Sequence, residues 1–254
     1  MILKQLLKSI KRKFIIIKFK RNHSEKERFE CPICQYSGPF MDVRPTTGIR
    51  KNAMCPSCKS LERHRLQFLV LETIIKELEP KSIRVLHFAP EPFLEKYLSN
   101  KFKSYETADL NMKGVTHNVN LENLPFKSES YDFVFASHVL EHVPDDQKAI
   151  SEIHRVLSSN GIAILPVPIV SEKTIEYPEP NPYEAYHVRA PGWDYSERYK
   201  KQFSKVKDFN SSSFDGKNQL FVCENRSNFP TKECPLRPQM HGEKHLEIVP
   251  ICYK

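Results

Sequence analysis

The sequence predicts an α/β protein in which a doubly wound, mostly parallel sheet carries helices on both faces and follows a small zinc-ribbon-like module. Three observations support this fold class. Apolar strand patterns alternate with helical patterns along residues 83–225, as they do in parallel sheets. Two Cys-x-x-Cys turns lie within residues 25–60. A length of 254 residues is enough for one α/β domain and one small module.

Residues 1–24 are predicted to form a basic amphipathic arm. The chain has 39 basic residues, eight of them within residues 1–21, which leaves 31 to balance the 31 acidic residues. Because the excess charge is confined to the arm, nucleic acid is not an expected partner. Apolar residues recur there at steps of three and four: Leu3, Leu6, Leu7, Ile10 and Phe14.

This pattern predicts a helix that lies on an anionic membrane surface. The protein would then be cytoplasmic and peripheral on the inner membrane face. A disordered tail and a helix docked on the body are the alternatives. Charges interrupt the arm too often for a membrane span or a cleavable signal peptide.

Four cysteines predict a metal site: Cys31, Cys34, Cys55 and Cys58. They form two turns separated by 20 residues, which matches zinc-ribbon spacing. Turn signals at residues 38–39 and 46–48 predict a short hairpin between them. Four thiolates complete a tetrahedral Zn²⁺ sphere, so we expect a structural ion. Two disulfides are the alternative, but no secretory signal indicates an oxidising compartment.

Residues 61–82 are predicted to connect the module to the sheet through a helix, Leu61–Leu78, which Pro80 ends. Residues 169–189 contain several prolines and predict a long loop, and residues 226–254 predict an irregular tail. The predicted strands are Ile83–Phe88, Tyr105–Leu110, Val115–Val119, Tyr131–Ala136, Ile162–Val167, Val206–Phe209 and Gln219–Glu224. The predicted helices are Glu91–Ser99, Asp145–Ser158 and Tyr195–Phe203.

In a doubly wound sheet, ligands bind beyond the carboxyl ends of the strands, where strand order reverses. The loop after the first strand, with Phe88, Ala89 and Glu91, should therefore face a ligand. Asp109 follows 21 residues after Phe88, at the end of the second strand. A carboxylate in this place can accept hydrogen bonds from both ribose hydroxyls of a nucleoside. An ordinary loop carboxylate is the alternative.

Several phrases resemble the class I S-adenosylmethionine-dependent methyltransferases of Rossmann-like, type 11-like form. They are NLENLPF (120–126), YDFV (131–134), SHVLEH (137–142), EIHRVL (152–157) and NGI (160–162). The resemblance covers about residues 83–224. The phrases CKSLERHR (58–65) and VLHFAPE (85–91) are similar to those of bacterial methyltransferase-like proteins that begin with a cysteine-rich module. The resemblance implies a transferase that moves a methyl group from S-adenosylmethionine to an acceptor.

The resemblance also implies roles for single residues. Asp109 would bind the ribose hydroxyls, and Leu110 would pack against adenine. Asn120 stands where the family has an acid, and its carbonyl oxygen would accept from the adenine amino group. Leu121 would offer its backbone N–H to the ring.

The first loop departs from the family's pattern, which has an acid and several glycines there. Phe88, Ala89 and Glu91 would form a cofactor-binding loop of different sequence, in which Glu91 pairs with the α-ammonium of the cofactor. Ser137 and His138 would face the methionine half and the methyl group.

The acceptor is not identified by the sequence; a cell-surface saccharide, a small metabolite and a protein are the alternatives, and the basic arm favours a saccharide or a lipid-linked glycan. If the acceptor is a hydroxyl, His138 is the first candidate for a general base, followed by Glu141, His142 and His187. These histidines could instead hold the loop in shape. Two other classes of function stay open: a non-catalytic binding protein that retains the fold, and a nucleic-acid-binding or -modifying protein that uses the zinc module.

Overall fold

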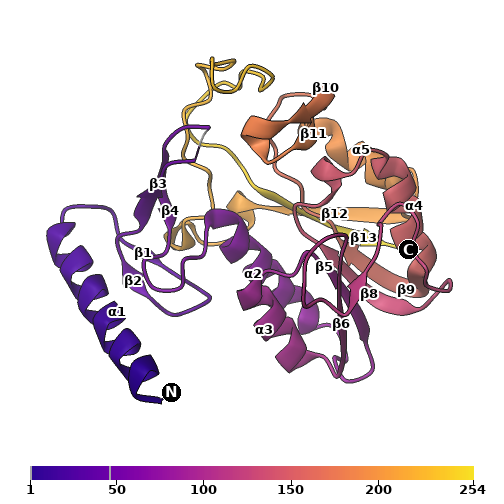
Figure 1. Cartoon of the computed structure of the whole chain (residues 1–254), viewed down its shortest axis with the longest axis horizontal. Helices are drawn as coiled ribbons and strands as arrows, with labels where there is room; N and C mark the ends of the chain where they lie inside the picture. Colours follow the sequence, from indigo (N-terminus) through magenta and orange to yellow (C-terminus); the bar gives the residue numbers. More distant parts are fainter. Residues whose placement is uncertain (1, 46) are drawn as a thin grey trace.

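A seven-stranded sheet forms the centre of the protein (Figure 1). The computed structural model describes residues 2–45 and 47–254, although not the side chains of residues 2–10 and 13. The strands of this sheet are β5 (Arg84–Phe88), β6 (Ser104–Asp109), β7 (His117–Asn118), β8 (Tyr131–Ala136), β9 (Leu157–Ile164), β12 (Lys205–Asn210) and β13 (Ile248–Tyr253). Their order is β12-β13-β9-β8-β5-β6-β7.

The sheet is parallel from β9 to β7, and β13 runs antiparallel to both of its neighbours. The chain proceeds from β5 outward to β6 and β7, then returns to β8 on the other side of β5. Strand order therefore reverses between β5 and β8. The mostly parallel, doubly wound sheet predicted from the sequence is confirmed, and its ligand edge lies at the carboxyl ends of these two strands.

Helices bury both faces of the sheet. Side chains of α2 (Glu62–Ile75) and α3 (Pro92–Lys101) form one apolar cluster with Val85 and Phe133. Side chains of α4 (Asp146–Val156) and α5 (Ser196–Lys200) form the other with Leu86 and Val134. Adjacent residues of one strand thus enter opposite cores, as the alternation of side chains in a strand requires.

The start of α4 follows directly from its sequence. The Oδ1 atom of Asp145 accepts from the backbone N–H of Lys148 at 3.0 Å, which satisfies one of the free donors at the helix start. The helix ends at Val156, two residues before the predicted Ser158, because the chain is already extended as β9 from Leu157.

The N-terminal module lies to one side of the sheet, beside the long helix α1 (Ile2–Asn22) (Figure 1). It contains two antiparallel pairs, β1 (Phe29–Glu30) with β2 (Ser37–Gly38), and β3 (Met41–Val43) with β4 (Arg50–Met54). The second pair confirms the predicted hairpin, although Thr46 of its turn lies outside the described residues. The side chains of Leu3, Leu6, Leu7 and Ile10 also lie outside them.

Within the described part of the chain, no helix combines the length and apolar character needed to cross a bilayer. The short 3₁₀ helices are Leu140–His142, Pro182–Glu184, Trp193–Tyr195, Ser211–Ser213 and Gly216–Asn218.

One buried arginine joins the module to the sheet domain. Arg65, in the first turn of α2, is fully buried. Its Nη1 atom donates to the carbonyl oxygens of Ala53 and Ser60 at 3.0 and 2.8 Å. Its Nε atom donates to those of Asn218 and Gln219 at 2.9 and 3.1 Å. A planar fork of five donors can serve several fixed carbonyls at once, so α2 is anchored to both parts.

The prediction of a long loop over residues 169–189 was wrong. This segment contains the hairpin of β10 (Ile175–Asn181) and β11 (His187–Ala190). Prolines 178 and 180 lie within β10. A proline is tolerated there because β10 pairs on one side only, so the missing N–H can face away from β11.

Two further predictions near the C-terminal end were wrong. Residues 219–224 form isolated bridges rather than a strand, and Gln219 begins them in the left-handed region with φ 48°. Residues 226–254 are not wholly irregular, because β13 lies between β12 and β9. The sequence signal for β13 is obscured by Pro250, which stands opposite Asp208 in the middle of the ladder.

Candidate active site and cysteine cluster

Three of the predicted cofactor residues lie together at the ligand edge. Phe88 is in register with Ala108 on β6 and with Ala136 on β8. The residues that follow Phe88, Ala108 and Ala136 are Ala89, Asp109 and Ser137, respectively. These residues therefore emerge side by side where the strand order reverses.

A cleft of about 480 Å³ opens beside this edge. Ala89, Ser137 and His138 line it from the strand ends, and His187 lines it from the β10–β11 hairpin. Residues of the N-terminal module and of the C-terminal segment form the rest of its wall. The volume is in the range of small-molecule sites.

The backbone is strained at both strand ends that meet the cleft. Ala89 has φ 47° and His138 has φ 54°, both in the left-handed region. This conformation costs a non-glycine residue roughly 1–2 kcal/mol. The strain is held by hydrogen bonds from Ala89 N to Ala108 O and from His138 N to Pro166 O, each at 2.9 Å. Such strain is concentrated at functional sites.

Glu91 follows the first strand and is tied to the start of α2. Its Oε1 atom accepts from His64 Nε2 at 2.8 Å and from Arg63 Nη2 at 3.3 Å. Because His64 Nδ1 accepts from Leu61 N, the ring proton belongs on Nε2. Burial would raise the pKa of Glu91, but His64 and Arg63 lower it to about 2. Its Oε2 atom is buried and has no hydrogen-bond partner among the described residues.

The second strand end is held by the same helix. Gln67 Nε2 donates to Ser137 Oγ at 2.8 Å, and both side chains are buried. Sequence reasoning did not select Arg63, His64 or Gln67. The charged phrase over residues 58–65 contains Arg63 and His64 and could have drawn attention to them. Only the fold shows that this part of the chain lies beside the ends of β5 and β8.

The three candidate histidines surround the buried carboxylate of Glu141, which is the other candidate base. Glu141 Oε1 lies 3.4 Å from His138 Nδ1 and 4.0 Å from His187 Nε2. The rings of His142 and His187 are 4.7 Å apart. Burial lowers the pKa of His187, which favours its neutral form. The structure thus brings His138, His142 and His187 together, while the role of each stays a prediction.

The residues predicted to hold the nucleoside lie farther along the same edge. Asp109 Oδ1 accepts from the backbone N–H groups of Asn111 and Met112 at 2.8 and 2.7 Å, which fixes the loop after β6. The Leu110 side chain is 60% exposed, so it is free to cover a ring. Asn120 Oδ1 accepts from Glu122 N at 2.9 Å. The side chains of Leu121 and Phe88 are buried in the core, which leaves only their backbone for a ligand.

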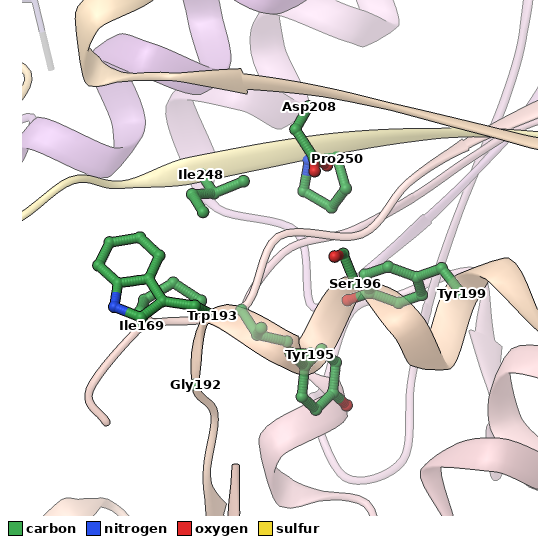
Figure 2. Close-up of a pocket in the computed structure, with 10 residues that line it drawn as sticks. Ile169, Gly192, Trp193, Tyr195, Ser196, Tyr199, Asp208, Ile248 and Pro250 are labelled. Carbon is green, nitrogen blue, oxygen red and sulfur yellow. The ribbon is translucent and has the colours of Figure 1, made fainter. Parts of the chain in front are cut away.

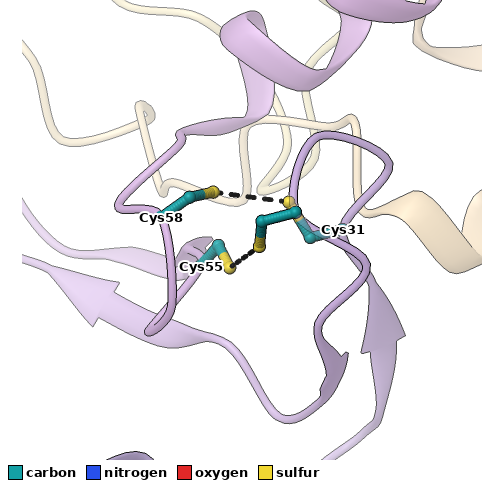
Figure 3. Close-up of side chains that lie close together, drawn as sticks. Cys31, Cys55 and Cys58 are labelled. Carbon is teal, nitrogen blue, oxygen red and sulfur yellow. Dashed lines mark hydrogen bonds between the residues drawn. The ribbon is translucent and has the colours of Figure 1, made fainter. Parts of the chain in front are cut away.

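The four cysteines of the N-terminal module converge, as Figure 3 shows for Cys31, Cys55 and Cys58. Cys31 Sγ lies 3.5 Å from Cys58 Sγ, and Cys34 Sγ lies 3.6 Å from Cys55 Sγ. All four sulfur atoms lie within 4.8 Å of one another. A disulfide bond would require about 2.05 Å, whereas thiolates around one zinc ion stand about 3.8 Å apart. The spacing therefore fits a four-thiolate metal site and not the two disulfides.

A second cavity lies under the antiparallel part of the sheet (Figure 2). Asp208 and Ile248 from the sheet face Ser196 and Tyr199 across it. Its volume is about 30 Å³. That is room for about one water molecule, so the cavity is too small for a cofactor.

Residues 95–165 match the profile of a methyltransferase domain family. The match begins inside α3, so β5 and the loop with Ala89 and Glu91 precede it. Among curated proteins, the chain is similar to 2-methyl-6-phytyl-1,4-hydroquinone methyltransferase 2, chloroplastic, of Oryza sativa subsp. japonica, with 30% identity over 97 residues. The similar stretch is 38% of this chain, and it spans only about 25% of the length of that relative.

The chain is similar to several solved structures. The crystal structure of the MccD protein has 15% identity and a TM-score of 0.50, covering 73% of this chain and 96% of that one. A methyltransferase dependent on S-adenosylmethionine from Mesorhizobium loti has 12% identity and a TM-score of 0.48, covering 74% and 100%. Together with the domain match, the sheet order establishes the class I, Rossmann-like methyltransferase fold for the central domain.

Proposed function

We propose that the protein is an S-adenosylmethionine-dependent methyltransferase whose acceptor binds in the cleft. One observation carries the proposal: Asp109, Ala89 and Ser137 emerge side by side at the reversal edge of a methyltransferase fold, next to that cleft. Ligands of doubly wound sheets bind at this edge.

The residues at the edge suit the parts of the cofactor. When bound, S-adenosylmethionine supplies a methyl group whose carbon–sulfur bond breaks as the acceptor bonds to the carbon. Asp109 would accept from the ribose hydroxyls, and the exposed Leu110 would cover the adenine. Asn120 would accept from the adenine amino group, beside the backbone of Leu121. The unpartnered Glu91 Oε2 supports an α-ammonium group near the first loop, because a buried carboxylate oxygen needs a donor.

His138 is the first candidate for the base that takes the acceptor's proton. It directly follows Ser137, and its Nε2 atom is buried without a partner among the described residues. His187 and His142 are the other histidines that could take this role. The protein's further contribution would be to hold the acceptor in line with the methyl group and to exclude water.

The chemistry of the cleft supports a polar acceptor. Its far wall carries Arg226 and Arg237, which contact Glu224 and Glu184, respectively, each at 2.8 Å. Guanidinium groups donate and carboxylates accept hydrogen bonds, and hydroxyl groups can do both. A saccharide or a small hydroxylated metabolite therefore suits this wall better than an apolar ring.

We also propose that the cysteine cluster binds a structural zinc ion. Four thiolates fill its coordination sphere and leave no position open for a substrate. Ser60 Oγ lies 3.5 Å from Cys31 Sγ and 3.1 Å from Cys58 Sγ, and it can orient these ligands as outer partners of metal sites do.

Calorimetry with S-adenosylmethionine and S-adenosylhomocysteine tests the main proposal. The wild type should bind both, and Asp109→Ala should bind them at least about tenfold more weakly, since a lost hydrogen bond to a charged group is worth about 1.5–3 kcal/mol. Asp109→Asn keeps a carbonyl that can cap the loop and should lose less. Asp132→Asn is the matched control, because this aspartate lies at the start of β8 and pairs with Arg84.

The absence of a binding heat for the wild type would favour the alternative of a non-catalytic protein that retains the fold. Equal affinities for the wild type and Asp109→Ala would also contradict the proposed cofactor site.

A further inference from the structure

Glu141 is the most unusual buried group in the cleft. Its side chain is fully inaccessible, and both carboxylate oxygens lack a hydrogen-bond partner in the described part of the chain. A buried carboxylate without partners costs several kcal/mol. The nearest groups that can carry a positive charge are His138 Nδ1 at 3.4 Å and His187 Nε2 at 4.0 Å, and neither makes a hydrogen bond to the carboxylate. The residue lines the cleft, so a cation bound there could reach it.

Imidazole nitrogens surround this carboxylate. One ligand atom from each of Glu141, His142 and His187 lies within 4.8 Å of the others. Ligands around an ion with bonds of about 2.1 Å stand about 3.0–4.2 Å apart. The exposed His142 can close the remaining gap by a small rotation. His138 Nδ1 lies 3.4 Å from Glu141 Oε1 and is a further nitrogen close to the proposed site.

The backbone that carries these ligands is fixed by one arginine. Arg189 is buried and donates through Nη1 to the carbonyl oxygens of Leu140 and Val143 at 2.6 and 2.7 Å. It also donates through Nη2 to Pro144 O at 2.9 Å. Arg189 lies on β11, two residues after His187. The same strand therefore supplies one ligand and clamps the turn that supplies the other two, which preorganises the site.

We propose that Glu141, His142 and His187 bind a divalent transition-metal ion in the cleft. Two imidazoles and one carboxylate favour ions such as Zn²⁺, Fe²⁺ or Co²⁺ and leave positions open for a further ligand. This site is chemically distinct from the four-cysteine cluster, which has no open position.

The open positions suggest how the ion would serve the reaction, a role that rests on the proposed methyl transfer. An acceptor hydroxyl bound to the ion would have a lower pKa, as metal-bound water does. The acceptor would then be an oxygen compound, and its proton would pass to His138 or to water. Metal binding itself does not depend on the cofactor.

Titration with Co²⁺ tests the site on protein whose cysteine cluster is already loaded with zinc. The zinc-loaded wild type should take up one further equivalent and develop visible ligand-field bands without sulfur-to-cobalt charge-transfer absorption. Glu141→Gln and His142→Asn should each weaken Co²⁺ binding at least about tenfold, because even outer partners of metal ligands contribute 10–100-fold. His142 is exposed, so its variant should fold, which near-ultraviolet circular dichroism would verify.

Glu106→Gln is the matched control. Glu106 Oε2 also contacts a histidine, His117 Nε2, at 2.8 Å, but this pair lies on β6 and β7 and belongs to no group of three possible metal ligands among the described residues. Its substitution should leave Co²⁺ binding unchanged. The inference is overturned if the zinc-loaded wild type shows no visible bands, if the bands carry sulfur charge transfer, or if Glu141→Gln and His142→Asn bind Co²⁺ like the wild type. Because the titration contains no S-adenosylmethionine, these outcomes are independent of the calorimetry above.

Discussion

His87 occupies the interior of β5 and is fully buried. Its Nδ1 atom lies 2.7 Å from the hydroxyl oxygen of Tyr105, and its Nε2 atom has no partner among the described residues. Burial lowers the pKa of His87 to about 3, and the Glu91 carboxylate opposes this only in part. The native protein therefore keeps this imidazole neutral at pH values where an unfolded chain would protonate it.

This difference predicts a loss of stability in mild acid. The unfolded pKa is about 6.5, so between about pH 6.5 and 3 the unfolded chain binds a proton that the native state does not. The free energy of unfolding should then fall by up to about 1.4 kcal/mol per pH unit as the pH drops through this window. In His87→Gln, which cannot titrate, this part of the slope should be absent.

Denaturant unfolding at pH 7 and pH 5 would measure the effect. His241→Gln is the control, since His241 is exposed. A pH slope in His87→Gln that equals the slope of the wild type would contradict the prediction.

Single residues also show where sequence reasoning ends. Asp109 could be predicted as a cofactor-binding residue because its separation from Phe88 and its place at the end of a strand are visible in the sequence. The contacts of Gln67 with Ser137 and of His64 with Glu91 were not, because they join segments 70 and 27 residues apart. Ala89 was recognised as a departure from glycine, but its left-handed backbone is known only from the fold.

The strands also differ in how well the sequence predicts them. β5 and β8 are buried on both faces and are mostly apolar, so they were predictable. β10 and β13 contain prolines, which the same rules exclude from strands. They form because β10 pairs on one side only, and because β13 fills a gap between β9 and β12 that only the assembled sheet defines.

The helix α1 leads to a prediction about membranes. Phe14, Ile15 and Ile17 are 68%, 59% and 61% exposed, and basic residues such as Lys11 and Lys18 lie close to them in the sequence. Such a helix gains energy when its apolar side enters an anionic interface. The protein should sediment with vesicles that contain anionic lipids, and salt should weaken this binding.

A double variant, Phe14→Glu with Ile17→Glu, should remain in the supernatant. Ile49→Glu replaces an exposed apolar residue of the N-terminal module, outside α1, and serves as its control. If both variants sediment like the wild type, α1 has no role in membrane contact.

The two parts of the protein are linked strongly enough that metal removal should affect the cofactor site. The carbonyl oxygen of Ser60 accepts from the Cys55 backbone N–H at 2.9 Å and from Arg65 at 2.8 Å. The first two turns of α2 also hold Glu91, through His64, and Ser137, through Gln67. A chelator that strips the four thiolates should therefore lower the melting temperature. It should also weaken binding of S-adenosylhomocysteine several-fold, since structural zinc supplies folding energy.

Restoring zinc should recover both properties, as thermal unfolding and calorimetry on the same sample would show. Unchanged melting and affinity in protein that elemental analysis finds free of zinc would rule out this link.

The position of β13 has a consequence for biosynthesis. β12 reaches the sheet only through β13, although it precedes β13 by about 40 residues in the chain. A ribosome therefore releases β12 before its partner exists, and during this interval the flank of β9 stays open. Open strand flanks recruit other chains, so this nascent stage is where the polypeptide would depend most on chaperones.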